Sequence, residues 1–210
     1  MCNLYSVTKG QAAIREAFRV MADRTGNLPP LPGIFPDQMA PVIRNTPDGR
    51  ALSMLRWGFP GPPGVPGNRP VTNIRNTASA FWRAWMAPAH RCLVPATAFC
   101  EYLAGKPAVP HWFALGPDRP LFAFAGLWRP WTGVRGKIDG VHEVFAFLTT
   151  DANGIVGPIH PKAMPVLLTT AEACDTWMRA PIAEALMLQR PLPDAMLQVV
   201  ATGAKDDPAP

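Results

Sequence analysis

The sequence predicts one α+β domain, mainly antiparallel, in which a bent sheet or barrel carries helices at its edges. Three observations predict this class. The chain of 210 residues is long enough for one well-packed core. Its middle part consists of short apolar runs separated by turns rich in proline and glycine, as in sheets of short strands. No repeat and no internal linker separates two cores, so we assign residues 1–201 to a single domain and residues 202–210 to a frayed tail.

The first half of the chain alternates strands, helices and proline-rich loops. A strand is expected at residues 2–6, and the spacing of apolar residues through Met21 predicts a helix over residues 11–22. The run GNLPPLPGIFP is expected to have no regular structure, because proline fixes φ and removes a backbone donor. APVIR and ALSMLRWGF flank NTPDGR, whose Asp48-Gly49 pair predicts a hairpin. The run at residues 60–70 predicts a loop that carries binding groups, and SAFWRAWMA predicts a short helix.

The second half of the chain consists mostly of strands. RCLVPATAFCEYL, HWFAL, LFAFAGLW and HEVFAFLTT are the expected strands, and turn-rich segments separate them. Thr169 and Glu172 form a capping box that opens a helix through Met178. Pro181 is expected in the first turn of another helix that runs to about Gln189, and MLQVV predicts a final strand.

The charge and cysteine content limit the functional class. A net charge of +5, mostly from arginine, favours a polyanionic partner such as nucleic acid, although the arginines are scattered singly. No apolar run approaches the roughly 20 residues of a membrane-spanning helix, and the amino terminus does not resemble a signal peptide. Four widely spaced cysteines without a CxxC motif predict free thiols in a reducing cytoplasm. We expect a monomer that binds no membrane.

The chain opens with MCNLYS, which places a thiol next to the initiator methionine. Removal of Met1 would give Cys2 a free α-amine beside its thiol. Such a 1,2-aminothiol condenses with an aldehyde through the amine, and the thiol then closes a five-membered thiazolidine ring. The alternative is a structural role, since free cysteine is often a small buried apolar residue.

Polar residues interrupt the apolar pattern at three further places. Asn73 and Arg75 lie two residues apart, hence on one face if extended. Glu101 lies inside an apolar strand, where it either faces solvent or is buried with a raised pKa and a proton-transfer role. His160 lies between two prolines in a rigid turn. Each residue has a purely structural alternative, but together they supply the proton transfers and the positioning that an aminothiol needs.

The segments MCNLYS, NIRNTAS, FCEY and IHPKAMPVLL together resemble the SRAP domain, the SOS response-associated peptidase family, over essentially the whole chain. The resemblance implies an antiparallel, barrel-like core with peripheral helices and a positively charged channel for single-stranded DNA. It implies that Cys2 attacks the aldehyde of an abasic site and forms a thiazolidine DNA–protein crosslink. It also implies peptidase-like release of Met1 and a lyase-like activity.

The resemblance also assigns roles to individual residues. Asn73 would position the amino terminus and the ring, Glu101 would assist the amine and thiol chemistry, and His160 would handle protons at the sugar. Arg75 would contact the backbone beside the lesion. We expect Arg56, Trp57 and Lys162 as further DNA contacts. Two departures affect DNA binding: many members begin Cys-Gly-Arg where Asn3 and Leu4 stand here, and HPKAMP is one residue longer than the usual His-x-Arg-Met-Pro run.

Three other interpretations remain open. An amino-terminal cysteine is also the nucleophile of Ntn-type amidohydrolases, in which the α-amine is the base. A binding module could coat single-stranded DNA non-covalently, using tryptophans such as Trp57 and Trp112. A zinc site would need a set whose spacing matches no familiar finger, so we expect neither metal nor cofactor. The members of that set are His90, Cys92, Cys100 and His111.

Overall fold

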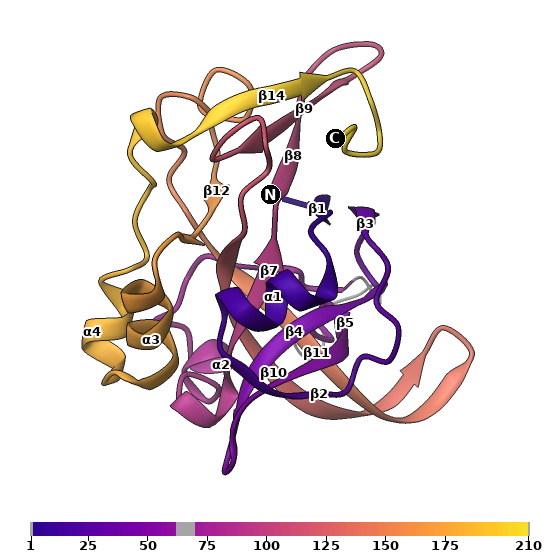
Figure 1. Cartoon of the computed structure of the whole chain (residues 1–210), viewed down its shortest axis with the longest axis vertical. Helices are drawn as coiled ribbons and strands as arrows, with labels where there is room; N and C mark the ends of the chain where they lie inside the picture. Colours follow the sequence, from indigo (N-terminus) through magenta and orange to yellow (C-terminus); the bar gives the residue numbers. More distant parts are fainter. Residues whose placement is uncertain (1, 62–69, 210) are drawn as a thin grey trace.

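The computed structural model describes residues 2–61 and 70–209 (Figure 1). Most of the loop expected at residues 60–70 therefore lies outside the described residues. The elements, in chain order, are β1 (Tyr5–Val7), α1 (Gln11–Ala17), β2 (Val20–Asp23), β3 (Leu31–Ile34), β4 (Met39–Thr46), β5 (Gly49–Trp57), β6 (Asn73–Ile74), α2 (Ala80–Arg83), the 3-10 helix η1 (Pro88–His90), β7 (Arg91–Ala96), β8 (Ala98–Leu103), β9 (Val109–Ala114), β10 (Phe122–Arg135), β11 (Ile138–Thr150), β12 (Met164–Pro165), β13 (Leu167–Leu168), α3 (Ala171–Arg179), α4 (Ile182–Leu186), the 3-10 helix η2 (Asp194–Met196) and β14 (Gln198–Thr202).

A closed barrel forms the centre of the molecule. Strands β11, β10, β7, β4 and β5 lie side by side in this order, each antiparallel to the next. A parallel pairing of β11 with β5 closes the ring, with Phe145 opposite Trp57. The expected hairpin is confirmed, since β4 and β5 meet at Gly49, whose φ of +116° suits glycine. The mainly antiparallel, barrel-like α+β class predicted from the sequence is confirmed.

A second sheet lies beside the barrel in the order β14-β9-β8-β1-β3. Strands β7 and β8 were expected as one continuous run, but Thr97 separates them and the chain passes from the barrel into this second sheet. Strand β1 pairs with β8 through Tyr5 opposite Phe99. The amino-terminal segment is therefore held against β8, and Figure 1 shows it near the middle of the molecule.

Aromatic side chains fill the space between the barrel wall and β1. The Tyr5 ring packs edge-on against Trp57 and Phe124, with ring centroids 5.0 and 5.5 Å apart. Phe124 stacks on Phe147 at 4.5 Å. Each of these four side chains is almost fully buried. Aromatic pairs of this kind add about 0.5–1.5 kcal/mol each beyond the area that they bury, so β1 is fixed firmly to the barrel.

The helices are shorter than the sequence predicts. Helix α1 ends at Ala17 instead of residue 22, because Arg19 adopts a left-handed φ of +52° and the chain continues as β2, paired in parallel with β5. Met21 is consequently 74% exposed instead of buried. Helix α3 begins after Thr170, whose hydroxyl accepts a bond from the backbone N–H of Ala173 at 3.1 Å, so the cap is Thr170 and not Thr169.

One segment expected to be irregular forms a strand. The proline-rich run contains β3, which lies at the edge of the second sheet, where proline is tolerated because one side of the strand needs no donors. Helix α4 ends at Leu186, earlier than expected. Figure 1 shows α3 and α4 together at one side of the barrel. Within the described residues, no helix is long and apolar enough to cross a membrane.

The prediction that residues 202–210 fray is wrong for the part of the tail that is described. Asp207 is 5% exposed and forms an ion pair with Arg119, whose Nη2 lies 2.8 Å from Oδ1. The Ser6 hydroxyl donates to the other carboxylate oxygen at 2.7 Å, and the Asp207 N–H donates to the Pro32 carbonyl at 2.9 Å. These bonds tie the tail to β1 and β3.

Candidate active site

Cys2 lies directly before β1 and is buried, with 1% of its surface exposed. Its thiol donates to the Leu4 carbonyl at 3.4 Å, and the Cys100 N–H donates to the same carbonyl at 2.9 Å. Burial raises the pKa of the Cys2 thiol well above its ordinary value, and the nearby charge of Glu101 raises it further. The thiol is therefore protonated at neutral pH.

Asn73 holds the backbone of Cys2. Its Nδ2 donates to the Cys2 carbonyl at 2.9 Å and to the Thr72 hydroxyl at 2.7 Å. That hydroxyl in turn donates to Oδ1 of Asn3 at 3.1 Å. The Oδ1 atom of Asn73 is buried, and no described residue donates to it. A buried carbonyl oxygen without a donor is an acceptor available to an amine beside Cys2.

Glu101 and His160 form the other side of the site. Glu101, on β8, is 3% exposed, and its Oε2 lies 3.8 Å from Nδ1 of His160. Burial raises the pKa of the Glu101 carboxyl to about 7, against the opposing positive charge of the amino terminus. Of the two possibilities that the sequence left open for Glu101, the structure has the buried carboxyl with a raised pKa.

His160 comes from the turn before β12, where its N–H donates to the Val156 carbonyl at 2.8 Å. Its side chain is 20% exposed. Partial burial lowers the pKa of its imidazole, and the positive charges of the amino terminus and Lys162 lower it further. A neutral imidazole beside a carboxyl of pKa about 7 is a pair that can exchange protons near neutral pH.

The structure thus brings Cys2, Asn73, Glu101 and His160 together from four separate parts of the chain. Thr72 also takes part, since it joins Asn73 to Asn3, and sequence reasoning missed it. Its position directly before Asn73 was the available signal, because a threonine hydroxyl can orient a neighbouring amide.

The residues expected to contact DNA differ in how exposed their side chains are. The Arg75 side chain is 46% exposed and pairs with Asp151 at the surface, whereas Asn73 is buried. Lys162 is exposed, two residues beyond His160. The Arg56 side chain is only 20% exposed, and its Nη1 donates to the backbone carbonyl of Asp37 at 2.7 Å.

Trp57 and Trp112 cannot stack on nucleic-acid bases, because both are buried. Trp57 is fully buried, and its indole N–H donates to the Thr72 carbonyl at 3.2 Å, so the prediction that it contacts DNA is wrong. Trp112 is also fully buried, and its indole N–H donates to the Ala204 carbonyl at 3.0 Å. A binding module that relies on these two rings is therefore excluded.

The proposed zinc set does not form a site. Within residues 2–61 and 70–209, no group of three histidine, cysteine, aspartate or glutamate side chains could hold a metal ion. His90 instead packs edge-on against Trp85, with ring centroids 4.9 Å apart. All four cysteines are buried free thiols.

Comparison with known proteins gives matches over most of the chain. Residues 1–204 match the family model for SOS response associated peptidase (SRAP). The chain is 30% identical over 151 residues to the abasic site processing protein YoqW of Bacillus subtilis, a match that covers 69% of this chain and 65% of YoqW. It is 30% identical over 152 residues to the abasic site processing protein YoaM of the same organism, covering 68% and 63%. The match therefore spans less than two thirds of these relatives.

Solved structures share the fold over nearly the whole chain. A protein of Bordetella bronchiseptica superposes with a TM-score of 0.75 at 26% identity, covering 97% of this chain and 99% of that one. A protein of Bacteroides thetaiotaomicron superposes with a TM-score of 0.71 at 21% identity, covering 96% and 90%. The barrel and the second sheet are thus a fold that distant relatives share.

Proposed function

Because the chain belongs to the SOS response-associated peptidase (SRAP) family, we propose that it processes abasic sites in DNA and traps them covalently through Cys2. One observation carries this proposal: the buried Glu101 carboxyl, with a pKa of about 7, lies beside both His160 and the Cys2 thiol. The printed names of YoqW and YoaM, which describe abasic site processing, support the same substrate.

The proposed reaction begins with hydrolysis of the peptide bond between Met1 and Cys2, which frees the α-amine. The amine nitrogen attacks the aldehyde carbon of the ring-opened abasic sugar, and loss of one water molecule gives an imine. The Cys2 sulfur then adds to the imine carbon while the nitrogen gains a proton. The product is a thiazolidine, and the overall condensation releases one water and needs no oxidant or reductant.

The raised pKa of the Cys2 thiol favours this order of steps. A protonated thiol is a weak nucleophile, so the amine attacks first and the thiol follows once the imine is in place. Asn73 fits the amine step, because its unpaired Oδ1 can accept from the amine while its Nδ2 holds the Cys2 carbonyl. Glu101 accepts a proton from the amine or the thiol and passes it to the neutral imidazole of His160, which then donates it to the sugar oxygen as the ring opens.

The strand proposed to carry the lesion is single-stranded DNA. Arg75 is exposed two residues from Asn73, and Lys162 is exposed two residues from His160, so both can reach phosphates near Cys2. Arg56 is a lesser candidate, because Asp37 already occupies much of its guanidinium.

An Ntn-type amidohydrolase is the less favoured alternative. Such an enzyme needs a reactive thiol as its first nucleophile, whereas burial and the charge of Glu101 both disfavour ionisation of Cys2. Hydrolysis of a glutamine amide by the purified protein would support this alternative.

The test begins with the intact mass of the purified protein, which reports whether Met1 has been removed. Cys2→Ala is expected to abolish the adduct with single-stranded abasic DNA on a denaturing gel, and Cys2→Ser to give none or only a labile one. Cys174→Ala, which alters another buried cysteine, is the matched control and should crosslink normally. A durable adduct formed at the normal rate by Cys2→Ala would refute the proposal.

A further inference from the structure

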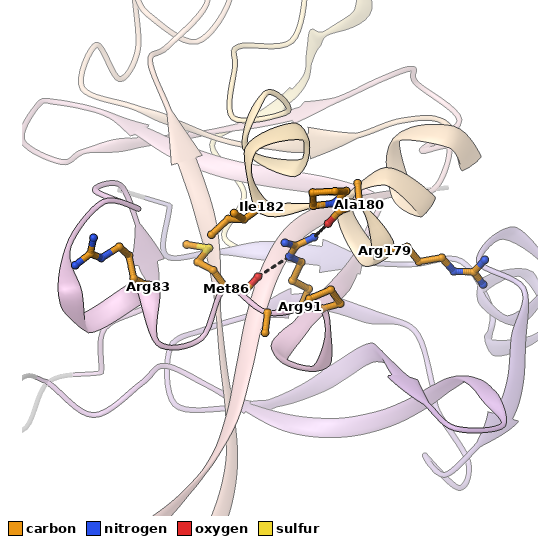
Figure 2. A pocket seen from close by; sticks show the side chains of 9 residues that line it. Arg83, Met86, Arg91, Arg179, Ala180 and Ile182 are labelled. Atoms are coloured by element: carbon orange, nitrogen blue, oxygen red, sulfur yellow. Dashed lines mark hydrogen bonds between the residues drawn. The ribbon is translucent and has the colours of Figure 1, made fainter.

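A cavity of about 420 Å³ lies outside the Cys2 site (Figure 2). The segment that contains α2 and η1 forms one side of it, and the junction of α3 with α4 forms the other. Met86 and Ile182 supply apolar walls, Arg91 lies between them, and Arg83 and Arg179 flank it. We propose that this pocket is a second contact for the phosphate backbone of single-stranded DNA. The inference rests on the proposed function, since it extends the path of the same strand.

Arg91 gives the pocket a fixed positive charge. The residue is 1% exposed, and its Nε donates to the Met86 carbonyl at 2.8 Å. Its Nη1 donates to the carbonyls of Trp177 and Ala180 at 3.0 and 2.6 Å, at the end of α3 where helical carbonyls lack partners. No described residue accepts from its Nη2. Arginine stays ionised even when burial lowers its pKa, so a cation is built into the floor of the pocket.

The orientation of Arg83 and Arg179 indicates which shape of ligand fits the pocket. Both are exposed, and neither forms an ion pair with a described residue, unlike Arg75, which pairs with Asp151. Figure 2 shows their side chains pointing in opposite directions, away from the pocket. Convergent arginines would hold a compact anion, whereas two divergent arginines with a cation between them fit an extended polyanion.

The two chain segments that line the pocket also meet beside Arg75. The Gln189 side chain, three residues beyond α4, donates to the Arg75 carbonyl at 3.0 Å. The Thr77 hydroxyl donates to Oε1 of the same glutamine at 3.1 Å. The chain after β6 and the chain around α4 therefore lie together both at Arg75 and at the pocket. A strand that contacts Arg75 can continue along this seam to Arg83 and Arg179.

The experiment measures the affinity for single-stranded oligonucleotides of about 6 and about 20 nucleotides, each at several salt concentrations. Each phosphate contact contributes about 0.7 to the slope of log affinity against log salt. The double variant Arg83→Ala/Arg179→Ala is expected to reduce the slope for the long oligonucleotide by about 1.4. Between about 50 and 200 mM salt, the wild type should therefore lose about sevenfold more affinity than the variant. The short oligonucleotide should be unaffected.

The matched control is Lys137→Ala/Lys205→Ala, which removes two exposed charges from the β10–β11 turn and from the tail. Figure 1 shows both regions away from α3 and α4. Equal slopes for the two double variants on the long oligonucleotide would overturn the inference. Failure of the proposed function would give a different result. In that case the wild type would not crosslink even a short abasic oligonucleotide, an outcome that depends on Cys2 and not on the pocket.

Discussion

Replacing Glu101 with glutamine tests the central electrostatic feature of the site without any DNA. The Glu101 carboxyl is 3% exposed, and burial raises its pKa from the ordinary 4.5 to about 7. A carboxyl with a raised pKa holds its proton more tightly in the folded state than in the unfolded state. Its contribution to stability is therefore present at low pH and is lost as the pH rises from 4.5 to about 7.

The size of this loss follows from the two pKa values. The difference between 4.5 and about 7 corresponds to about 3 kcal/mol of unfolding free energy. Glutamine has a similar shape and carries no charge at any pH. The stability of Glu101→Gln relative to wild type should therefore rise by about 3 kcal/mol between pH 4.5 and pH values above 7. The same variant should trap abasic DNA more slowly, because an amide cannot accept the proton.

Urea unfolding at several pH values measures this difference directly, since other titrating groups are common to both proteins. Glu184→Gln is the matched control, because it removes the same charge from an exposed position on α4. A stability difference between Glu101→Gln and wild type that stays constant with pH would refute the assignment of a buried, ionisable carboxyl. If Glu101→Gln traps abasic DNA more slowly but shows no pH-dependent gain in stability over wild type, the Glu101 carboxyl acts while it is exposed to solvent.

Two further predictions concern ion pairs. Arg75→Ala should weaken binding to single-stranded DNA and lower the slope of log affinity against log salt. Asp151→Asn should strengthen binding, because it frees Arg75 from its ion pair. If a titration gives both variants the same affinity as the wild type, the ion pair has only a structural role. Asp207→Asn should destabilise the protein by about 3–5 kcal/mol, because it leaves the Arg119 charge buried without its partner. A shift of less than about 1 kcal/mol in urea unfolding would show that the tail is not an anchor.

Local sequence signals predicted the β4–β5 hairpin better than the ends of helices. Asp48-Gly49 marked its hairpin because only a few residue types suit that turn. The apolar strand around Glu101 left open whether its carboxylate faces solvent or is buried, and the structure buries it. The end of α1 could not be predicted, since pairing of β2 with β5 overrides the helical spacing through Met21.

The wrong prediction for Trp57 has a physical cause. Arg56 and Trp57 are adjacent on β5, and adjacent side chains of a strand point to opposite faces. A surface role for the arginine therefore places the tryptophan inside the barrel, where it is fully buried. Neighbouring residues that look like one binding motif in a sequence can thus belong to two environments. The alternation rule was available, but no local feature showed which face was inward.

The bond between Asp207 and Ser6 has a consequence for synthesis of the protein on the ribosome. Translation makes Cys2 well before Asp207, yet the carboxylate of Asp207 is a partner of the strand that follows Cys2. A nascent chain that has not yet reached residue 207 carries the cysteine without this anchor. The surroundings of Cys2 are therefore completed only after residue 207 has been made, long after the cysteine itself.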